Sequence, residues 1–258
     1  MYKIIILAII QGITEFLPVS SSAHLIIART IMNLNLTNDV ALTLDISLHL
    51  GTMLAISIFF IKDLIRLVSS GFTKKNKDSK LFWNLIIATI PAGLIGLIFE
   101  DIFNEIIRNN KIIIGVALII MGIIIYIIDK VKKEEKELYD VNILDALKIG
   151  ISQIFALIPG VSRSGVTITT ARLLGINRVD STKFSFYLSL PIILGSALYT
   201  LLFKDINLDF NILIVGIFTS FITGIWTIKF LLHYINNHDY KIFMIYRLII
   251  GLYLIIFM

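Results

Sequence analysis

The sequence is organised around the stretch PGVSRSGVT, residues Pro159–Thr167, and its weaker double FLPVSSSAH, residues Phe16–His24. Both are polar, turn-forming insertions inside long apolar sequence. The first carries Arg163, and the second ends at His24 and directly follows Glu15. In a lipid-embedded chain such residues are rare and need a partner, because an unpaired charge there is costly. The two stretches therefore predict a site for an anion.

The composition defines the class of protein. Of the 258 residues, 57% are hydrophobic and 16% are charged, whereas soluble domains carry about 25% charged residues. We expect an integral membrane protein. The absence of cysteine excludes disulfides and thiol chemistry. The net charge of +5 comes from basic residues between the apolar spans, where the positive-inside rule accounts for them, so nucleic acid is not an expected partner.

Six apolar stretches are long enough to cross a bilayer, which takes roughly 17–25 residues each. We expect them to be transmembrane helices of an all-α protein, joined by loops that include 62–80 and 100–105. The six stretches are Val40–Ile61, Leu81–Phe99, Ile112–Ile128, Phe184–Phe203, Phe210–Leu232 and Ile242–Met258.

Shorter apolar segments precede the spans of each half. Met1–Phe16 and Ser20–Met32 are too short to cross and are joined by a Pro-Ser turn. They predict a re-entrant helical hairpin that returns to the face it entered from. A single kinked transmembrane helix remains the alternative. Ile143–Ile158 and Ser162–Leu174 repeat the pattern around Pro159 and predict a second hairpin.

Local matches about 142 positions apart indicate an internal repeat, with Gln11 aligned to Gln153 and VSSSA to VSRSG. We assign the halves to residues 1–130 and 141–258 of one membrane domain, joined by a charged cytoplasmic linker, 131–140. Each half has one hairpin and three crossings, an odd number, so the halves must be inverted. The distribution of Lys and Arg places both termini outside the cell. The site then opens to the outer face of a bacterial plasma membrane.

The turns are suited to phosphate because each begins a short helix. Ser20 or Ser21 in the first turn and Ser162 in the second are placed as N-caps. Helix N-termini offer free N–H groups and partial positive charge. Arg163 adds a guanidinium that binds phosphate oxygens in a bidentate way. The residues predicted to bind substrate are Ser20, Ser22, Ser162, Ser164, Gly165, Thr167 and Gln153.

The chemistry is predicted from the residues facing Arg163. Ser21 and His24 provide a nucleophile and an acid–base partner, while Glu15 serves as base or metal ligand. Which of Ser21, His24 or water attacks stays open. Glu15, with Gln11 one turn earlier, offers oxygen ligands to a divalent metal, Mg²⁺ or Ca²⁺. Asp45 and His49, one turn apart in the next span, are expected to support the site or to pair within the helices.

These residues resemble a known family, the undecaprenyl-diphosphatases of the bacitracin-resistance type. Its motifs (E/Q)GxxEFLPVSSxGH and PGxSRSGxT appear here as QGITEFLPVSSSAH, residues Gln11–His24, and PGVSRSGVT. LHLGTMLA, Leu48–Ala55, extends the similarity, which covers essentially the whole chain. Ala23 replaces the family's usual glycine, and Gln11 leaves Glu15 as the only carboxylate of its motif.

The resemblance implies hydrolysis of undecaprenyl diphosphate to the monophosphate and inorganic phosphate. This reaction recycles the lipid carrier of cell-wall synthesis and confers bacitracin resistance. It also implies inverted repeats, two re-entrant hairpins and a divalent metal. The expected partners are the polyprenyl diphosphate and the bilayer, and a homodimer is left open.

Two alternatives stay open at this point. Inverted repeats with broken helices are also transporter architecture, so a transporter or flippase for a polyprenyl phosphate is the main one. The other membrane lipid-phosphate phosphatases are less favoured, because their basic and later histidine motifs are absent from the expected places in this sequence.

Overall fold

The computed structural model describes residues 1–34, 36, 38–73, 75–99, 110–203 and 210–257. Within this part every regular element is helical, as expected for backbone that must satisfy its own hydrogen bonds in lipid. The first half contains α1 (Tyr2–Thr14), α2 (Ser21–Ile31), α3 (Asn38–Phe59), α4 (Ile61–Thr73), α5 (Lys77–Ile98) and α6 (Lys111–Val131). The second contains η2 (Leu138–Asp140), α7 (Ile143–Ser152), η3 (Gln153–Leu157), α8 (Arg163–Leu173), α9 (Arg178–Phe203), α10 (Phe210–Asn237) and α11 (Lys241–Phe257).

The lengths of these helices fit a membrane protein. Among the described residues, α5, α6, α9 and α10 are long and apolar enough to cross a bilayer. The pair α3 and α4, bent by 85° at their junction, makes a fifth if it is one span. The helix α11 has 17 described residues, at the lower limit for a crossing. The prediction of an all-α membrane protein is confirmed.

The predicted loop 62–80 was wrong for most of its length, because it contains α4 and the start of α5. In α4 the side chains of Leu67 and Ser70 are buried, whereas Ile65 and Phe72 are exposed. This is the spacing of an amphipathic helix, and the flanking lysines obscured it. The predicted loop 100–105 lies outside the described residues.

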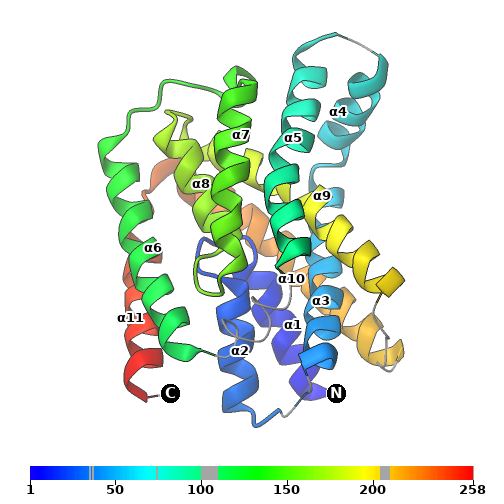
Figure 1. Ribbon diagram of the computed structural model, residues 1–258, viewed down its shortest axis with the longest axis vertical. Coiled ribbons are helices and arrows are strands. Elements are labelled where there is room, and N and C mark those ends of the chain that lie inside the picture. The colour runs from blue at the N-terminus through cyan, green and yellow to red at the C-terminus, as the bar shows by residue number, and fades with distance from the viewer. Residues whose placement is uncertain (35, 37, 74, 100–109, 204–209, 258) are drawn as a thin grey trace.

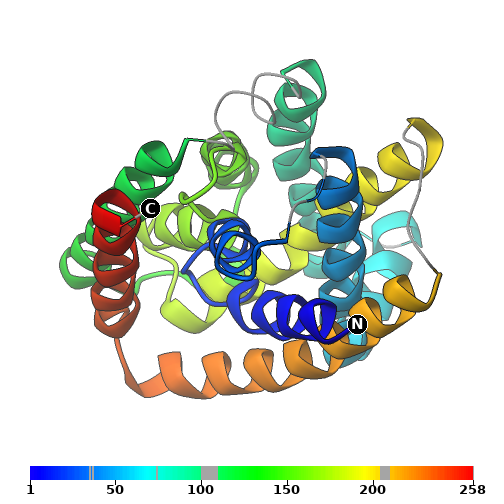
Figure 2. The same ribbon diagram turned by 90° about the horizontal axis from the view of Figure 1, so that it is seen from below.

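The two short helix pairs approach each other from opposite ends of the molecule. In Figure 1, α1 and α2 occupy the lower half and α7 and α8 the upper half, and their turns meet near mid-height. Longer helices surround them. Figure 2 shows α6 beside α11 at one edge and α1 along α10 at another, and α3 also packs on α10. The bundle therefore encloses two polar turns.

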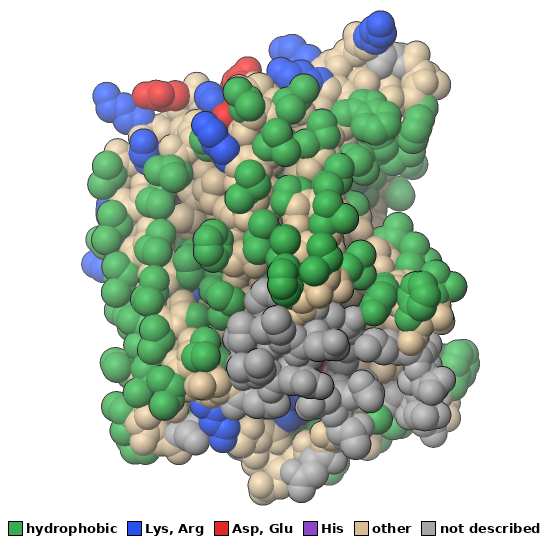
Figure 3. All heavy atoms as spheres, in the orientation of Figure 1, with side chains coloured by type: hydrophobic (Ala, Val, Ile, Leu, Met, Phe, Trp, Pro, Cys, Tyr) green, Lys and Arg blue, Asp and Glu red, His purple; other side chains and the backbone are tan. Residues whose placement is uncertain are grey.

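The surface has the charge distribution of a membrane protein. Figure 3 shows apolar side chains over the middle of the face in view, with Lys and Arg gathered chiefly at the end that carries the α4–α5 connection. Large apolar side chains such as Ile120, Leu198 and Phe230 are exposed on the long helices. Bilayer lipid is the environment that covers such side chains.

The connection between the halves is held in place rather than loosely solvated. The N–H groups of Glu135 and Lys136 donate to the carbonyl of Gly175, at 2.9 and 3.0 Å. Asp129 of α6 is buried. It accepts hydrogen bonds from Arg172, in the last turn of α8, and from Arg178, the first residue of α9. The linker and α6 are therefore attached to the loop between α8 and α9.

Both turns use backbone conformations that side chains rarely adopt. The N-cap residues Ser20 and Ser162 have φ of +77° and +75°, and Gly160 has φ of +98°. A Cβ at Gly160 would lie 2.5 Å from the carbonyl oxygen of Ile114. Strained backbone of this kind persists where its surroundings hold it, and such sites are often functional.

We expect Gly160→Ala to destabilise the protein, because its positive φ alone costs about 1–3 kcal/mol for a residue with a side chain. The matched control is Gly195→Ala in α9, where a Cβ would meet no atom of the described residues within 4 Å. The unfolding temperature measured in detergent should fall clearly for Gly160→Ala and stay unchanged for Gly195→Ala. Equal unfolding temperatures would contradict the strained geometry of this turn.

Candidate active site

Direct hydrogen bonds join the two turns. The N–H of Gly160 in the second turn donates to Ser20 Oγ in the first, at 3.1 Å. Ser164 Oγ, in the first turn of α8, donates back to the carbonyl of Leu17, also at 3.1 Å. Since these residues are about 140 positions apart in the sequence, the two polar stretches form one structure, as predicted.

An ion pair connects the same two stretches. Arg163 Nη2 donates to Glu15 Oε1 at 2.7 Å, and the two side chains are 15% and 5% exposed. The other terminal nitrogen, Nη1, donates to the carbonyl of Ser185 in α9 at 2.8 Å. The guanidinium is thus oriented by two partners from different parts of the chain, the carboxylate of Glu15 and the carbonyl of Ser185.

Glu15 is the centre of a hydrogen-bonded cluster. Its Oε2 accepts from Ser21 Oγ at 2.7 Å and from Gln11 Nε2 at 3.1 Å. His49 Nδ1 of α3 lies 3.2 Å from the same oxygen and 2.8 Å from Gln11 Nε2. This arrangement brings the predicted residues Gln11, Glu15, Ser21 and Arg163 together. A serine that donates to a carboxylate is placed to lose its proton to it.

A pocket of about 210 Å³ opens beside this cluster. One side is polar, with the serines of both turns, and the other is apolar and comes from α3, η3 and α9. The pocket therefore suits a molecule with an anionic group and a hydrocarbon part. The lining residues are Glu15, Ser20, Ser21, Ser22, Ile46, His49, Ala156, Ser162, Arg163, Ile192, Ile193 and Ser196.

Other predicted residues of the second turn make hydrogen bonds within the turn and to α9. Ser162 Oγ caps α8 by accepting from the N–H of Gly165 at 3.1 Å. Thr167 Oγ1 donates to the carbonyl of Arg163 at 2.8 Å and lies 2.7 Å from Ser185 Oγ. Gln153 is 2% exposed and lies outside the pocket lining, and its side-chain amide has no partner among the described residues.

His24 lies apart from the cluster. Its Nδ1 is 2.7 Å from the carbonyl oxygen of Ser20, and its Nε2 is 2.7 Å from the hydroxyl of Tyr246 in α11. The ring also stacks on Tyr246, with 5.5 Å between centroids. Ser21, its expected partner, instead donates to Glu15. The structure thus does not pair Ser21 with His24.

The sequence left the roles of Asp45 and His49 open, and the structure separates them. His49 lines the pocket and contacts Glu15. Asp45 forms a bidentate ion pair with Arg29 of α2 and braces that helix against α3. Ser185 was not predicted. Its position on a helix of mostly ordinary transmembrane sequence gave no signal of a contact with Arg163.

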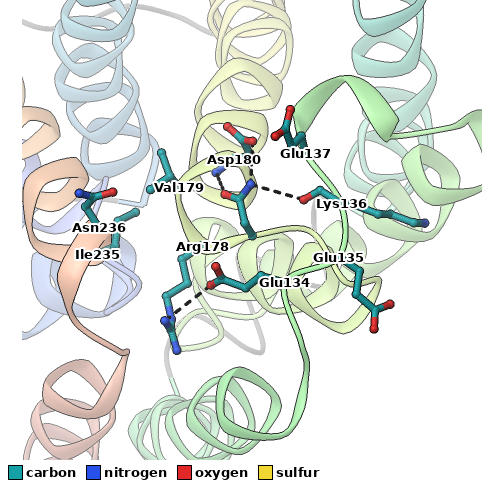
Figure 4. Close-up of a pocket in the computed structure, with 10 residues that line it drawn as sticks. Glu134, Glu135, Lys136, Glu137, Arg178, Val179, Asp180, Ile235 and Asn236 are labelled. Carbon is teal, nitrogen blue, oxygen red and sulfur yellow. Dashed lines mark hydrogen bonds and ion pairs between the residues drawn. The ribbon is translucent and has the colours of Figure 1, made fainter.

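A larger pocket, about 540 Å³, lies beside the connection between the halves (Figure 4). Acidic side chains outnumber basic ones in its lining. Its arginine, Arg178, is already paired with Asp129 at 2.8 Å and Glu134 at 3.6 Å. This pocket is not suited to an anionic ligand.

The fold and the site together define a polytopic membrane protein with a polar pocket and an ion pair where two short helix pairs meet. The model of the bacitracin resistance protein BacA family matches residues 4–253. The chain belongs to that family. Its relatives include the undecaprenyl-diphosphatase of Caldicellulosiruptor bescii, 42% identical over 99% of this chain and 97% of the relative. The undecaprenyl-diphosphatase of Desulforudis audaxviator is 43% identical over 98% and 95% of the two chains.

Removing the carboxylate at the centre of the cluster should lower stability. Glu15→Gln leaves the Arg163 guanidinium largely buried without its counter-charge, and breaking a buried pair in this way costs about 3–5 kcal/mol. Asp239→Asn provides the control, since Asp239 pairs with exposed Lys130 at 2.8 Å near the surface. The unfolding temperature measured in detergent should fall for Glu15→Gln only. A fall of the same size in both variants would show that the buried pair has no special importance.

Proposed function

We propose that the protein hydrolyses undecaprenyl diphosphate to undecaprenyl phosphate and inorganic phosphate. The reaction would recycle the lipid carrier of cell-wall synthesis and confer bacitracin resistance. The observation that carries the proposal is the contact of Arg163 with Glu15, which places a guanidinium, a carboxylate and Ser21 at one pocket. The family membership and the names of its relatives support the same activity.

The substrate's two parts match the two sides of the pocket. The diphosphate would lie on the serines of the turns and on the N-termini of α2 and α8, whose N–H groups favour anions. The first isoprenoid units would lie on the apolar side formed by Ile46, Ala156, Ile192 and Ile193. Arg163 would exchange Glu15 for phosphate oxygens and stabilise the charge that develops as the terminal phosphoryl group is transferred.

The hydrogen bonds of Ser21 and Glu15 support the following proton chemistry. The hydroxyl of Ser21 attacks the terminal phosphorus to form a phosphoserine, which water then hydrolyses to inorganic phosphate and free serine, or it orients a water that attacks the phosphorus directly. Glu15 accepts the proton, since Ser21 Oγ already donates to it at 2.7 Å. Undecaprenyl phosphate is the leaving group. His24 supports the first turn through the carbonyl of Ser20.

A divalent metal, Mg²⁺ or Ca²⁺, belongs to the proposal. The described residues contain no group of three or more His, Cys, Asp or Glu side chains placed to hold a metal. However, Gln11 Oε1 is buried beside Glu15 and has no hydrogen-bond partner in the part of the chain that the structure describes. One carboxylate and one amide oxygen fit Mg²⁺, which usually takes few protein ligands and completes its shell with phosphates and water. Bound there, it would neutralise charge on the diphosphate.

We further propose six transmembrane crossings and two re-entrant hairpins, arranged as inverted repeats 1–130 and 141–258. The matching N-cap serines, Ser20 and Ser162, and the pairing of α6 with α11 support this arrangement. The basic end of the molecule would face the cytoplasm. Both termini and the pocket would then face the outside of the bacterial plasma membrane.

Arg163→Ala should lower phosphate release by at least 10³-fold, because phosphoryl transfer depends on positioned positive charge. Arg66→Ala is the control, since Arg66 is about half exposed, pairs with Asp63 and does not line the pocket beside Glu15. Purified protein in detergent is incubated with undecaprenyl diphosphate, and phosphate is measured. Undiminished release by Arg163→Ala would refute the site. No release by the parent protein would favour a transporter or flippase.

Chelation should reduce the same reaction at least tenfold, and added Mg²⁺ or Ca²⁺ should restore it. Gln11→Leu should raise the metal concentration needed for half-maximal activity, because it removes the buried amide oxygen beside Glu15 that is proposed to bind the metal. Full activity after exhaustive chelation would remove the metal from the mechanism.

A further inference from the structure

Arg247 of α11 contacts both turns but does not line the pocket between them. Its side chain is 1% exposed, and its guanidinium donates to the carbonyl of Pro18 in the first turn at 3.0 Å. In the second turn it donates to the carbonyls of Gly160 and Val161, at 2.6 and 3.1 Å. One side chain therefore joins the two stretches that form the site.

The same guanidinium is anchored to a long helix. Arg247 Nε donates to the carbonyl of Leu118 in α6 at 3.0 Å, and Nη2 lies 3.4 Å from that of Ala117. No carboxylate among the described residues contacts it, whereas the equally buried Arg172 pairs with Asp129. The partners of Arg247 are backbone carbonyls, so its position follows the backbone of both turns.

The neighbouring residue on α11 supports the first turn at a second point. The hydroxyl of Tyr246 lies 2.7 Å from His24 Nε2, and His24 Nδ1 lies 2.7 Å from the carbonyl oxygen of Ser20. Ser20 is the strained N-cap that contacts Gly160. The helix α11 thus contacts each turn although neither Tyr246 nor Arg247 lines the pocket.

We propose that Arg247 is a positioning residue for the reaction assigned above: it holds the two turns at the spacing that lets Arg163, Glu15 and Ser21 share one pocket. This inference rests on the proposed function for its kinetic readout. Only arginine has a planar fork of five donors able to reach carbonyls of both turns and of α6. Lysine has three donors on a single nitrogen and cannot reach all three elements.

The test compares Arg247→Lys with Arg172→Lys, which changes an equally buried arginine that does not contact the turns. Both variants are expected to lose stability. For Arg247→Lys, kcat/KM for phosphate release should fall about 100-fold per folded molecule, the loss typical of a misplacement of about 1 Å. For Arg172→Lys it should stay within about threefold of the parent.

A second readout does not depend on turnover. Inorganic pyrophosphate should raise the unfolding temperature of the parent and of Arg172→Lys, with the concentration at half effect at least tenfold higher for Arg247→Lys. This readout distinguishes failure of the role assigned to Arg247 from failure of the proposed function. If the parent protein binds pyrophosphate but releases no phosphate from undecaprenyl diphosphate, only the proposed function is overturned. A folded Arg247→Lys variant with both readouts within threefold of the parent would overturn the inference.

Gly122→Ala covers the case in which Arg247→Lys does not fold. A Cβ at Gly122 of α6 would lie 3.1 Å from Arg247 Cβ and 3.5 Å from its Cδ, so the added methyl moves the stem and keeps the guanidinium. We expect a threefold to tenfold loss of kcat/KM. Unchanged kcat/KM and pyrophosphate response in this variant would count against the role of Arg247.

Discussion

The structure depends on one constraint, that a charge inside the bilayer must have a partner. Arg163 and Glu15 meet this requirement for each other, and in doing so they connect turns from opposite ends of the molecule. A bare guanidinium at this depth would be costly. The pair therefore gives each of the two largely buried charges a partner.

The turns show the same constraint acting on the backbone. A helix that ends in the middle of a membrane protein exposes N–H and carbonyl groups where lipid offers no hydrogen bonds. Here Ser20 and Ser164 satisfy groups of the opposite turn, and Arg247 satisfies carbonyls of both. Interrupted helices that leave N-termini for a ligand are therefore possible because each turn supplies the other's missing partners.

Much of this could be predicted from the sequence because charged residues in apolar sequence have few options. Arg163 and Glu15 had to find partners, so their meeting was predictable. His24 was harder, since its partner Tyr246 lies on a helix whose aromatic residues give no sign of a specific contact. Arg247 carried a signal, a charged residue within the apolar span Ile242–Met258, but spacing alone could not show that its partners are carbonyls. The helix α4 was missed because lysines surround an ordinary amphipathic pattern.

The attachment of the connection between the halves has a mechanical consequence. Asp129, at the end of α6, is clasped by Arg172 and Arg178, and the following residues are bonded to the loop before α9. Alternating access requires one repeat to rock against the other. Such a stroke would have to break buried ion pairs at one end and the carbonyl contacts of Arg247 in the middle. These contacts therefore oppose movement of α6 relative to α8, α9 and α11.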